Sequence, residues 1–166
     1  HGDVAMIDAL ARSYNLATVH LGLDVGVQKV ERLLEALVPG VDVSPHPSLL
    51  LGATEMTPLQ VAQAYQYLAA DGHQLPLSSV TAVIDRQGRA ISRYRAPQRA
   101  GELVEAARLV SFAMQEGSRS GTGAALVGLG LGDLDIAGKT GTSDDQRDSW
   151  YAGFTGGHLA VVWLGR

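Results

Sequence analysis

The segment Ala137-Gly138-Lys139-Thr140-Gly141-Thr142-Ser143 decides the fold and the function predicted for this chain. Apolar residues lead into it and the polar residues 143–146 follow, so the pattern places its lysine where a β-strand ends. The lysine supplies a cation, the threonines supply hydroxyls, and the central glycine lets a ligand lie against the strand backbone. Such a strand can hold an extended peptide by β-augmentation, with these side chains fixing the terminal carboxylate. A strand end with a surface lysine would show the same letters.

Further β-rich runs follow the lysine segment. We predict strands at 135–138, 149–154 and 159–164, and Gly156-Gly157 suits a tight hairpin between the last two. The third strand is apolar on both faces, which predicts that it is covered on both sides. The end of the chain therefore predicts an antiparallel sheet.

Helical periodicity dominates the residues before these strands. The best marked helix begins after Thr57, where Pro58 and Gln60 complete the start signals, including a capping box, and it ends at Gly72. A glycine-rich stretch that ends near 132 predicts an irregular loop. Apolar spacing predicts the other helices over about 4–11, 27–38 and 103–117.

A small hairpin interrupts the helical part. Residues 80–85 and 89–94 are β-rich and are joined by Arg86-Gln87-Gly88, which predicts a peripheral hairpin. Helices first and consecutive strands last predict an α+β fold, with an antiparallel sheet packed against helices. One partial domain would span 1–166, its helical part about 1–117 and its sheet part about 133–166.

Composition excludes several classes of protein. Thirteen basic and seventeen acidic residues give a net charge of -4, and the basic residues are scattered, so no nucleic-acid partner is expected. The chain has no cysteine, and its histidines share no metal-ligand spacing, so neither a metal nor another cofactor is expected. It contains no apolar run of membrane-spanning length and does not begin with Met, so it reads as a piece of a longer protein.

A second motif, Ser13-x-Asn15, lies near the end of the first predicted helix. A serine and an asparagine at this spacing usually make only capping and turn hydrogen bonds. However, S-x-x-K, S-D-N and K-T-G together mark penicillin-binding proteins and class A β-lactamases. The second and third motifs occur here in that order, with a helix-rich segment between them.

At these residues the chain resembles the transpeptidase domain of bifunctional, class A penicillin-binding proteins of Gram-negative bacteria. The resemblance runs from about Asp3 to Arg166. Ser120 stands where the family often has arginine before Gly-Thr-Gly. The segments that carry the resemblance are Ser13-Tyr14-Asn15-Leu16-Ala17-Thr18-Val19, Leu51-Gly52-Ala53-Thr54-Glu55-Met56-Thr57-Pro58-Leu59-Gln60-Val61-Ala62, Gly121-Thr122-Gly123, Ala137 to Ser143 and Asp148-Ser149-Trp150-Tyr151-Ala152-Gly153-Phe154.

The first family motif is missing from the chain. Its two lysines, Lys29 and Lys139, are preceded three residues earlier by Gly26 and Ile136, so no S-x-x-K occurs. In the family that serine lies upstream of S-x-N and attacks the penultimate D-Ala carbonyl of a stem peptide. The resemblance thus describes a C-terminal part of the domain, which alone is expected to be inactive and to expose an apolar sheet surface that favours self-association.

The resemblance also implies roles for the residues that are present. Ser13 would pass a proton between the absent lysine and the leaving amine, and Asn15 would bind the acyl side of the substrate. Lys139 would keep the local field positive. Thr140, Gly141 and Thr142 would bind the substrate, with the Thr142 N–H forming half of the oxyanion hole.

The implied function is D,D-transpeptidation of peptidoglycan stem peptides, with β-lactam antibiotics as inhibitors. The parent protein would be anchored at the periplasmic face of the inner membrane and would work with other cell-wall proteins. A D-Ala-D-Ala carboxypeptidase or β-lactamase of the same fold is one alternative, and the segment from Thr54 to Ala62 argues against it. A non-catalytic β-lactam sensor or interaction module is another, which the missing serine supports.

Overall fold

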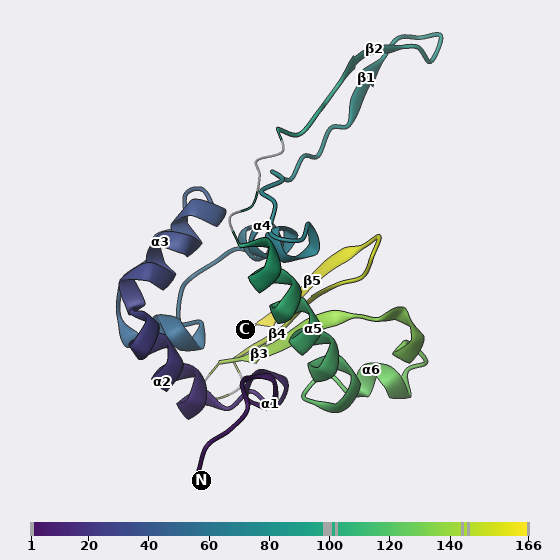
Figure 1. Cartoon of the computed structure of the whole chain (residues 1–166). Helices are drawn as coiled ribbons and strands as arrows, with labels where there is room; N and C mark the ends of the chain where they lie inside the picture. The colour runs from purple at the N-terminus through teal and green to yellow at the C-terminus, as the bar shows by residue number, and fades with distance from the viewer. Residues whose placement is uncertain (1, 98–100, 102, 144, 146, 166) are drawn as a thin grey trace.

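The structure is a computed structural model that describes residues 2–97, 101, 103–143, 145 and 147–165. Helices surround one side of a three-stranded antiparallel sheet, and a long hairpin projects from the body (Figure 1). The α+β fold is thereby confirmed. The predicted polar loop 143–146 includes residues that lie outside the described ranges.

The sheet is formed by β3 (Ala137–Thr142), β4 (Asp148–Phe154) and β5 (Leu159–Gly165), in the order β3-β4-β5. Lys139 lies opposite Ala152 on β4, and Trp150 of β4 lies opposite Trp163 of β5. The two indole rings are 5.9 Å apart between centroids, as aromatic pairs across neighbouring strands commonly are. Both β3 and β5 are edge strands in the described part of the chain.

All the helices of the described residues come before the three-stranded sheet, and the last two are short turns directly ahead of β3. They are α1 (Met6–Ala11), α2 (Asn15–Val25), α3 (Val27–Leu37), η1 (Pro47–Leu51), α4 (Pro58–Ala69), α5 (Val104–Ser120), α6 (Ala125–Gly128) and η2 (Gly132–Leu134). The capping box of α4 is confirmed, because the Thr57 N–H donates to Gln60 Oε1 at 2.9 Å and the Gln60 N–H donates to Thr57 Oγ1 at 3.2 Å.

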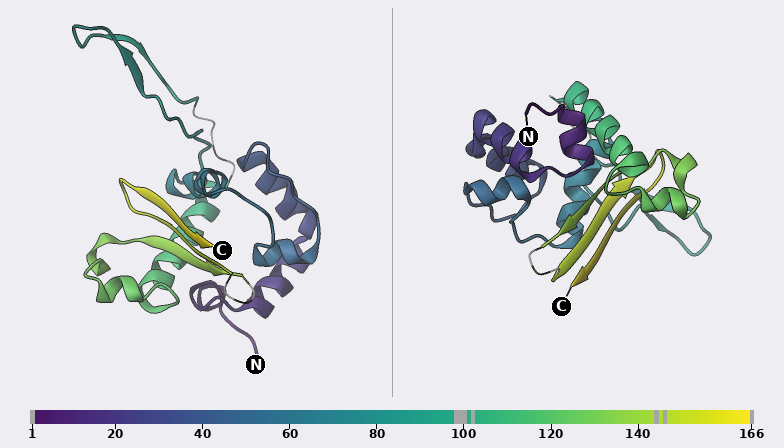
Figure 2. Two further views of the ribbon diagram at one scale, coloured as in Figure 1. Left: turned by 180° about the vertical axis from the view of Figure 1, so that it is seen from behind. Right: turned by 90° about the horizontal axis from the view of Figure 1, so that it is seen from below.

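Packing places the helices in two groups, which Figure 2 shows from behind and from below. Helix α5 packs on β3, α4 packs on β4 and β5, and α1 lies against α5. The second group is built on a small apolar cluster of Val27, Val43 and Leu49, which joins α3 to η1. None of the described helices is both long and apolar enough to span a membrane.

The structure corrects three expectations about the strands and the loop before them. Strand β3 begins at Ala137 and continues through Thr142, so the lysine lies within the strand and not at its end. The predicted irregular loop contains the rest of α5, which runs to Ser120, and also α6, and η2 begins where the predicted loop ends. The third strand is not covered on both sides, because Trp163 is 47% and Leu164 70% exposed on its opposite faces.

A close approach of α1 to the end of α5 depends on Gly121. A Cβ atom at Gly121 would lie 2.1 Å from the backbone oxygen of Ala11, and backbone atoms cannot move aside as a flexible side chain can. We expect Gly121→Ala to lower the free energy of unfolding by about 2–3 kcal/mol, the usual effect of overpacking. Urea denaturation of the chain measures the change.

Gly128→Ala is the matched control for this prediction. A Cβ atom at Gly128 would meet nothing within 4 Å, and this glycine lies in α6, where alanine has the better helix propensity. Its effect should be neutral or slightly stabilising. Equal stabilities of the two variants would show that α1 can shift away from α5 without loss.

Candidate active site

Ser13 lies in the tight turn between α1 and α2, and its backbone conformation is unusual. Its φ angle is 57°, in the left-handed region that residues with a side chain seldom adopt. The Tyr14 N–H donates to the Ala9 carbonyl at 2.9 Å and the Ser13 N–H donates to the Leu10 carbonyl at 3.2 Å, which closes the turn. The turn thus presents the serine side chain outward from the end of α1, at an energetic cost on the order of 1–2 kcal/mol.

Lys139 reaches this serine from the sheet. Its Nζ donates a hydrogen bond to Ser13 Oγ at 3.0 Å, although the two residues are 126 positions apart. A second hydrogen bond, also 3.0 Å long, runs from Nζ to the carbonyl oxygen of Thr140. The two contacts hold the ammonium between the α1–α2 turn and the edge of β3.

The ammonium of Lys139 is partly desolvated. Burial lowers the pKa of this lysine below its usual value, because the charged form loses hydration. Among the described residues, no carboxylate oxygen lies within ion-pair distance, 4.0 Å, of its Nζ. The site therefore offers a positive charge to which an anionic ligand can bind.

The lowered pKa of Lys139 can be measured because the chain has only one other lysine, Lys29. In NMR spectra of chain labelled at the lysine side chains, the Lys139 resonance should titrate below the usual pKa of lysine. Lys29→Arg leaves a single resonance and so assigns it. Since the unfolded chain binds this proton more tightly, stability should rise with pH between the folded and the unfolded pKa of Lys139. A Lys139 midpoint at or above the usual lysine pKa would contradict the burial.

The free edge of β3 lies beside this ammonium. The Ser143 N–H donates to the Asp148 carbonyl at 3.1 Å, so residues 139, 141 and 143 direct their backbone groups toward β4. Because backbone groups alternate along a strand, the N–H of Thr142 and the carbonyl of Thr140 face away from β4. An extended peptide laid along this edge can pair with them.

Thr122 is a contact that the sequence did not single out. Its Oγ1 accepts a hydrogen bond from Thr140 Oγ1 at 2.9 Å, and its N–H donates to the Ala11 carbonyl at 3.2 Å. Thr122 thus connects the middle of β3 to the end of α1, only two residues before Ser13. The Gly-Thr-Gly turn was noticed for its resemblance to the family, but nothing in its letters indicates which threonine it contacts.

The other predicted site residues are not part of this hydrogen-bond network. Asn15 is the first residue of α2 and is exposed, and it makes no side-chain hydrogen bond within the part of the chain that the structure describes. Thr142 is exposed at the end of β3, and Gly141 lies opposite Trp150, whose Cβ would be 3.3 Å from a Cβ atom at Gly141. The structure thus joins Ser13, Lys139 and Thr140 in one network.

The half-buried Tyr151, whose hydroxyl oxygen is fully enclosed, supports β3 from behind. A Cβ atom at Gly138 would lie 2.0 Å from the hydroxyl of Tyr151, so only glycine fits beneath that ring. The neighbouring Tyr65 of α4 is half-buried, and desolvation of its hydroxyl raises its pKa to about 12. Tyr65 is therefore a neutral packing group, and the ring of Tyr151 packs beneath the strand at Gly138.

Comparison with known proteins agrees with this geometry. Residues 1–157 match the family model "Penicillin binding protein transpeptidase domain", so the chain belongs to the penicillin-binding protein transpeptidase family. It is 40% identical over 168 residues to penicillin-binding protein 1B of Vibrio cholerae, a match that covers 99% of this chain and 21% of that protein. Penicillin-binding protein 1B of Escherichia coli K12 is 38% identical over 166 residues, which cover 99% of this chain and 20% of that protein. The chain thus spans about a fifth of the length of these relatives.

Solved structures show the same fold. The crystal structure of penicillin-binding protein 1A from Haemophilus influenzae superposes with a TM-score of 0.86 at 20% identity, covering 99% of this chain and 30% of that one. Penicillin-binding protein PonA1 from Mycobacterium tuberculosis gives a TM-score of 0.79 at 27% identity, and the match covers 99% of this chain and 48% of that one. The resemblance to transpeptidase domains of Gram-negative penicillin-binding proteins is thereby confirmed.

Proposed function

We propose that this chain supplies the S-x-N and K-T-G parts of the active site of a serine-type D-Ala-D-Ala transpeptidase, which cross-links peptidoglycan stem peptides. The observation that carries the proposal is the contact of Lys139 Nζ with Ser13 Oγ beside an unpaired strand edge. A proton-relaying hydroxyl, a cation and free backbone groups thereby lie together, as acyl transfer to a serine requires.

The substrate would lie extended along β3. Its terminal carboxylate would bind the hydroxyls of Thr140 and Thr142 in the field of Lys139, and Gly141 would let the peptide approach the strand closely. The Thr142 N–H, which faces away from β4, would donate to the oxygen of the reacting carbonyl. Asn15, exposed at the start of α2, would bind the acyl side of the peptide.

Acyl transfer would proceed from the serine of an S-x-x-K motif, which these 166 residues do not contain. That hydroxyl would attack the penultimate D-Ala carbonyl, and its proton would pass through the motif's lysine and Ser13 to the amine of the departing D-Ala. An amine of a second stem peptide would then attack the acyl-enzyme, forming the cross-link and releasing the serine. Lys139 would stabilise the developing negative charge throughout.

β-Lactams would acylate the same serine. Penicillin-binding protein A of M. tuberculosis, a structural neighbour with a TM-score of 0.78, has been solved as an imipenem acyl-enzyme complex. PonA1 has been solved in complex with penicillin V. These complexes and the names of the relatives support β-lactam binding here. We place the protein at the periplasmic face of the inner membrane, in company with other cell-wall proteins, where peptidoglycan is assembled.

Ser13→Ala tests this function in a longer form of the protein that carries an S-x-x-K serine. Loss of the relay should slow acylation by a fluorescent penicillin about a hundredfold, within the range known for general acid–base groups. The rate at which stem peptides are cross-linked, measured by chromatography of the digested product, should fall by a similar factor.

The matched control is Ser44→Ala, since Ser44 is an exposed loop residue outside the site. It should acylate and cross-link at the unaltered rate. A protein that binds penicillin but forms no cross-link with an acceptor peptide would be a sensor or a carboxypeptidase, and unimpaired acylation of Ser13→Ala would refute the relay.

A further inference from the structure

The β1–β2 hairpin forms an arm, defined here as residues 78–95, that projects from the body and away from the end where α1 and β3 meet (Figure 1). Its strands are β1 (Ala82–Ile84) and β2 (Ala90–Arg93), which pair with each other. Val83, Ile84 and Ile91 are 52%, 62% and 69% exposed. A free two-stranded hairpin is only marginally stable in water, so an arm that exposes these side chains gains stability when something covers it.

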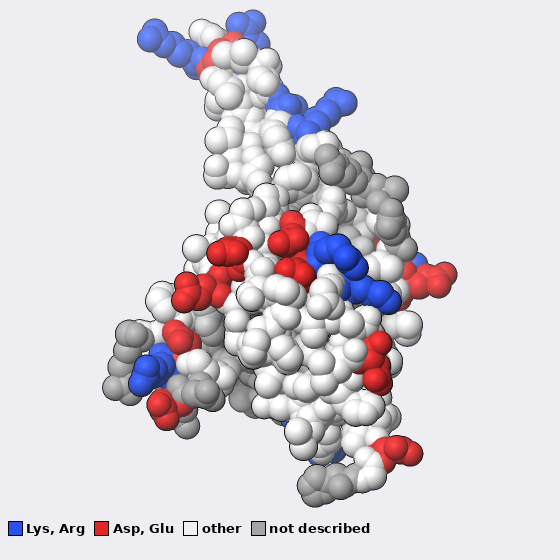
Figure 3. Space-filling model, turned by 90° about the vertical axis from the view of Figure 1, so that its left-hand side faces the viewer, with Lys and Arg blue, Asp and Glu red and all other residues white. Residues whose placement is uncertain are grey.

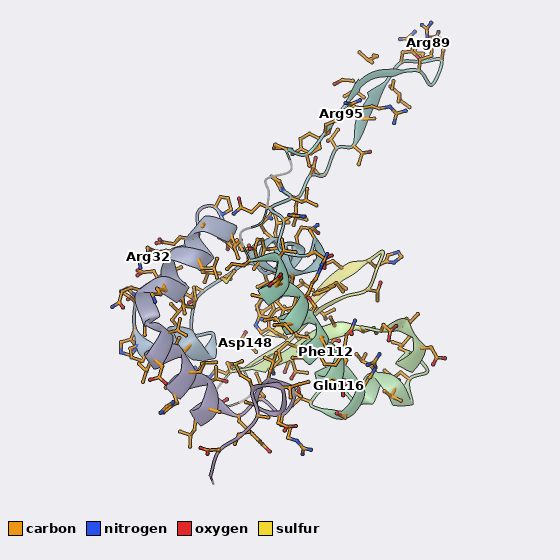
Figure 4. All side chains as sticks on the ribbon, in the orientation of Figure 1. Arg32, Arg89, Arg95, Phe112, Glu116 and Asp148 are labelled. Carbon is orange, nitrogen blue, oxygen red and sulfur yellow. The ribbon has the colours of Figure 1, made fainter. Side chains whose placement is uncertain are left out.

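The arm carries a charge opposite to that of the body. It contains Asp85 and four arginines, 86, 89, 93 and 95, which give +3, and since the whole chain carries -4 the remaining residues carry -7. Arg89 Nε donates to Asp85 Oδ2 at 2.7 Å. Among the described residues, Arg93 and Arg95 make no ion pair. Figure 3 shows basic side chains along the arm and acidic ones over the body, and Figure 4 labels Arg89 at the tip and Arg95 nearer the body.

A groove on the arm combines apolar and basic groups. It has a volume of about 350 Å³ and is lined by residues of both strands of the arm, among them Val80, Val83 and Tyr94. Arg93 and Arg95 also line it. An occupant of this groove must therefore bring apolar side chains together with negative charge.

The strands of the arm also present unpaired backbone groups. In the described part of the chain, the two-stranded sheet has an outer edge on each side, and β-branched residues along it favour addition of a strand. Only another polypeptide can pair with these groups in register, which neither a nucleic acid nor a lipid headgroup does. A second arm is a poor candidate, because it would place +3 against +3.

We propose that the arm is a docking site for an acidic, extended segment of another protein, which adds as a third strand. Its alternate apolar side chains would lie beside Val83 and Tyr94 on one face of the hairpin, and its carboxylates would pair with Arg93 and Arg95 on the other face. The acidic body would repel such a segment, so binding is confined to the arm. This interaction is separate from the acyl-transfer site, whose residues all lie outside the arm.

The test uses the 166-residue chain and three fluorescein-labelled peptides of four dipeptide repeats, Glu-Val, Lys-Val and Glu-Ser. Fluorescence anisotropy should show that Glu-Val binds at least tenfold more tightly than either of the others, and that its affinity falls as salt is raised. The double variant Arg93→Ser/Arg95→Ser should lose at least tenfold in affinity for Glu-Val. The charge-matched control Arg12→Ser/Arg32→Ser alters two exposed body arginines and should stay within twofold.

Four results would overturn the proposal. Equal affinity for Lys-Val and Glu-Val, or an equal loss of affinity in the two double variants, would remove the role of the arm's charge. Binding to vesicles of phosphatidylglycerol without binding to any peptide would identify the arm as a lipid-binding element. Failure of all peptides to bind, with both double variants folded by circular dichroism, would show that the arm docks no acidic strand.

Discussion

Incubation of the 166-residue chain with penicillin is expected to leave its intact mass unchanged. Acylation requires a serine activated by a neighbouring base, and the chain contains no S-x-x-K motif. Its two lysines are Lys29, on α3, and Lys139, which is held between Ser13 and β3. The expected effect is a complete loss of acylation relative to a longer form that carries the motif.

Ser13 is the only serine that contacts a lysine among the described hydrogen bonds, yet it is poorly suited to replace the missing nucleophile. The ammonium of Lys139 donates to Ser13 Oγ, so it withdraws electron density from the hydroxyl and does not accept its proton. The left-handed turn also fixes the position of this serine. A misplacement of about 1 Å from the productive geometry can reduce a rate about a hundredfold.

Intact-mass spectrometry after hours of incubation measures the outcome directly. A longer form with its S-x-x-K serine provides the positive control and should gain one penicillin per chain. A stoichiometric mass increase on the 166-residue chain would contradict the prediction. If Ser13→Ala then removed that increase, Ser13 would itself be the nucleophile, and its proposed role as a relay would be wrong.

The features predicted correctly from sequence depend on strong local signals. The start of α4 was predicted because Thr57, Pro58 and Gln60 satisfy a capping box within four residues. The hairpin β1–β2 was predicted because Arg86-Gln87-Gly88 separates two β-rich runs, and Gly88 has the positive φ angle, 80°, that such turns need. In each case the residues that determine the structure are neighbours along the chain.

Features that depend on distant contacts were not predictable in this way. Helix α2 was not predicted, because its apolar residues are spread around the helix and do not form one face. The Thr140–Thr122 hydrogen bond joins residues 18 positions apart, and neither side chain indicates its partner. The pairing of Ser13 with Lys139 was expected only because of the family resemblance, since two short motifs 126 positions apart carry no geometric information.

The exposed surface of β5 shows a related limit. Its apolar sequence predicted a strand covered on both sides, but α4 is the helix that packs on it and the strand remains an edge. Trp163 is held by its partner strand, since its Nε1 donates to Asp148 Oδ1 at 2.9 Å. An apolar sequence indicates that a strand favours burial. Whether the strand is buried depends on which other segments pack against it.

Lys139→Ala, in a longer form that carries the S-x-x-K serine, is expected to slow acylation by penicillin about a thousandfold. The variant loses the hydrogen bond to Ser13, the positive field at the reacting carbonyl and the anchor for the substrate carboxylate, and removal of one comparable electrostatic group costs a hundredfold or more. The thermal stability of the protein should not fall in this variant. Since burial lowers the pKa of Lys139, the charged side chain is less favourable in the folded protein than in water, and its removal relieves that penalty.

The variant should therefore lose activity without losing stability. This is expected where a site retains a charge for function at the expense of stability. Stopped-flow acylation and thermal unfolding measure the two quantities on the same preparation. Lys29→Ala is the matched control, because it removes the other lysine of the chain from the solvent-exposed surface of α3 and should leave the acylation rate unaltered. A fall in thermal stability with an unaltered acylation rate would show that Lys139 is a structural residue, and the proposed active site would then lose its cation.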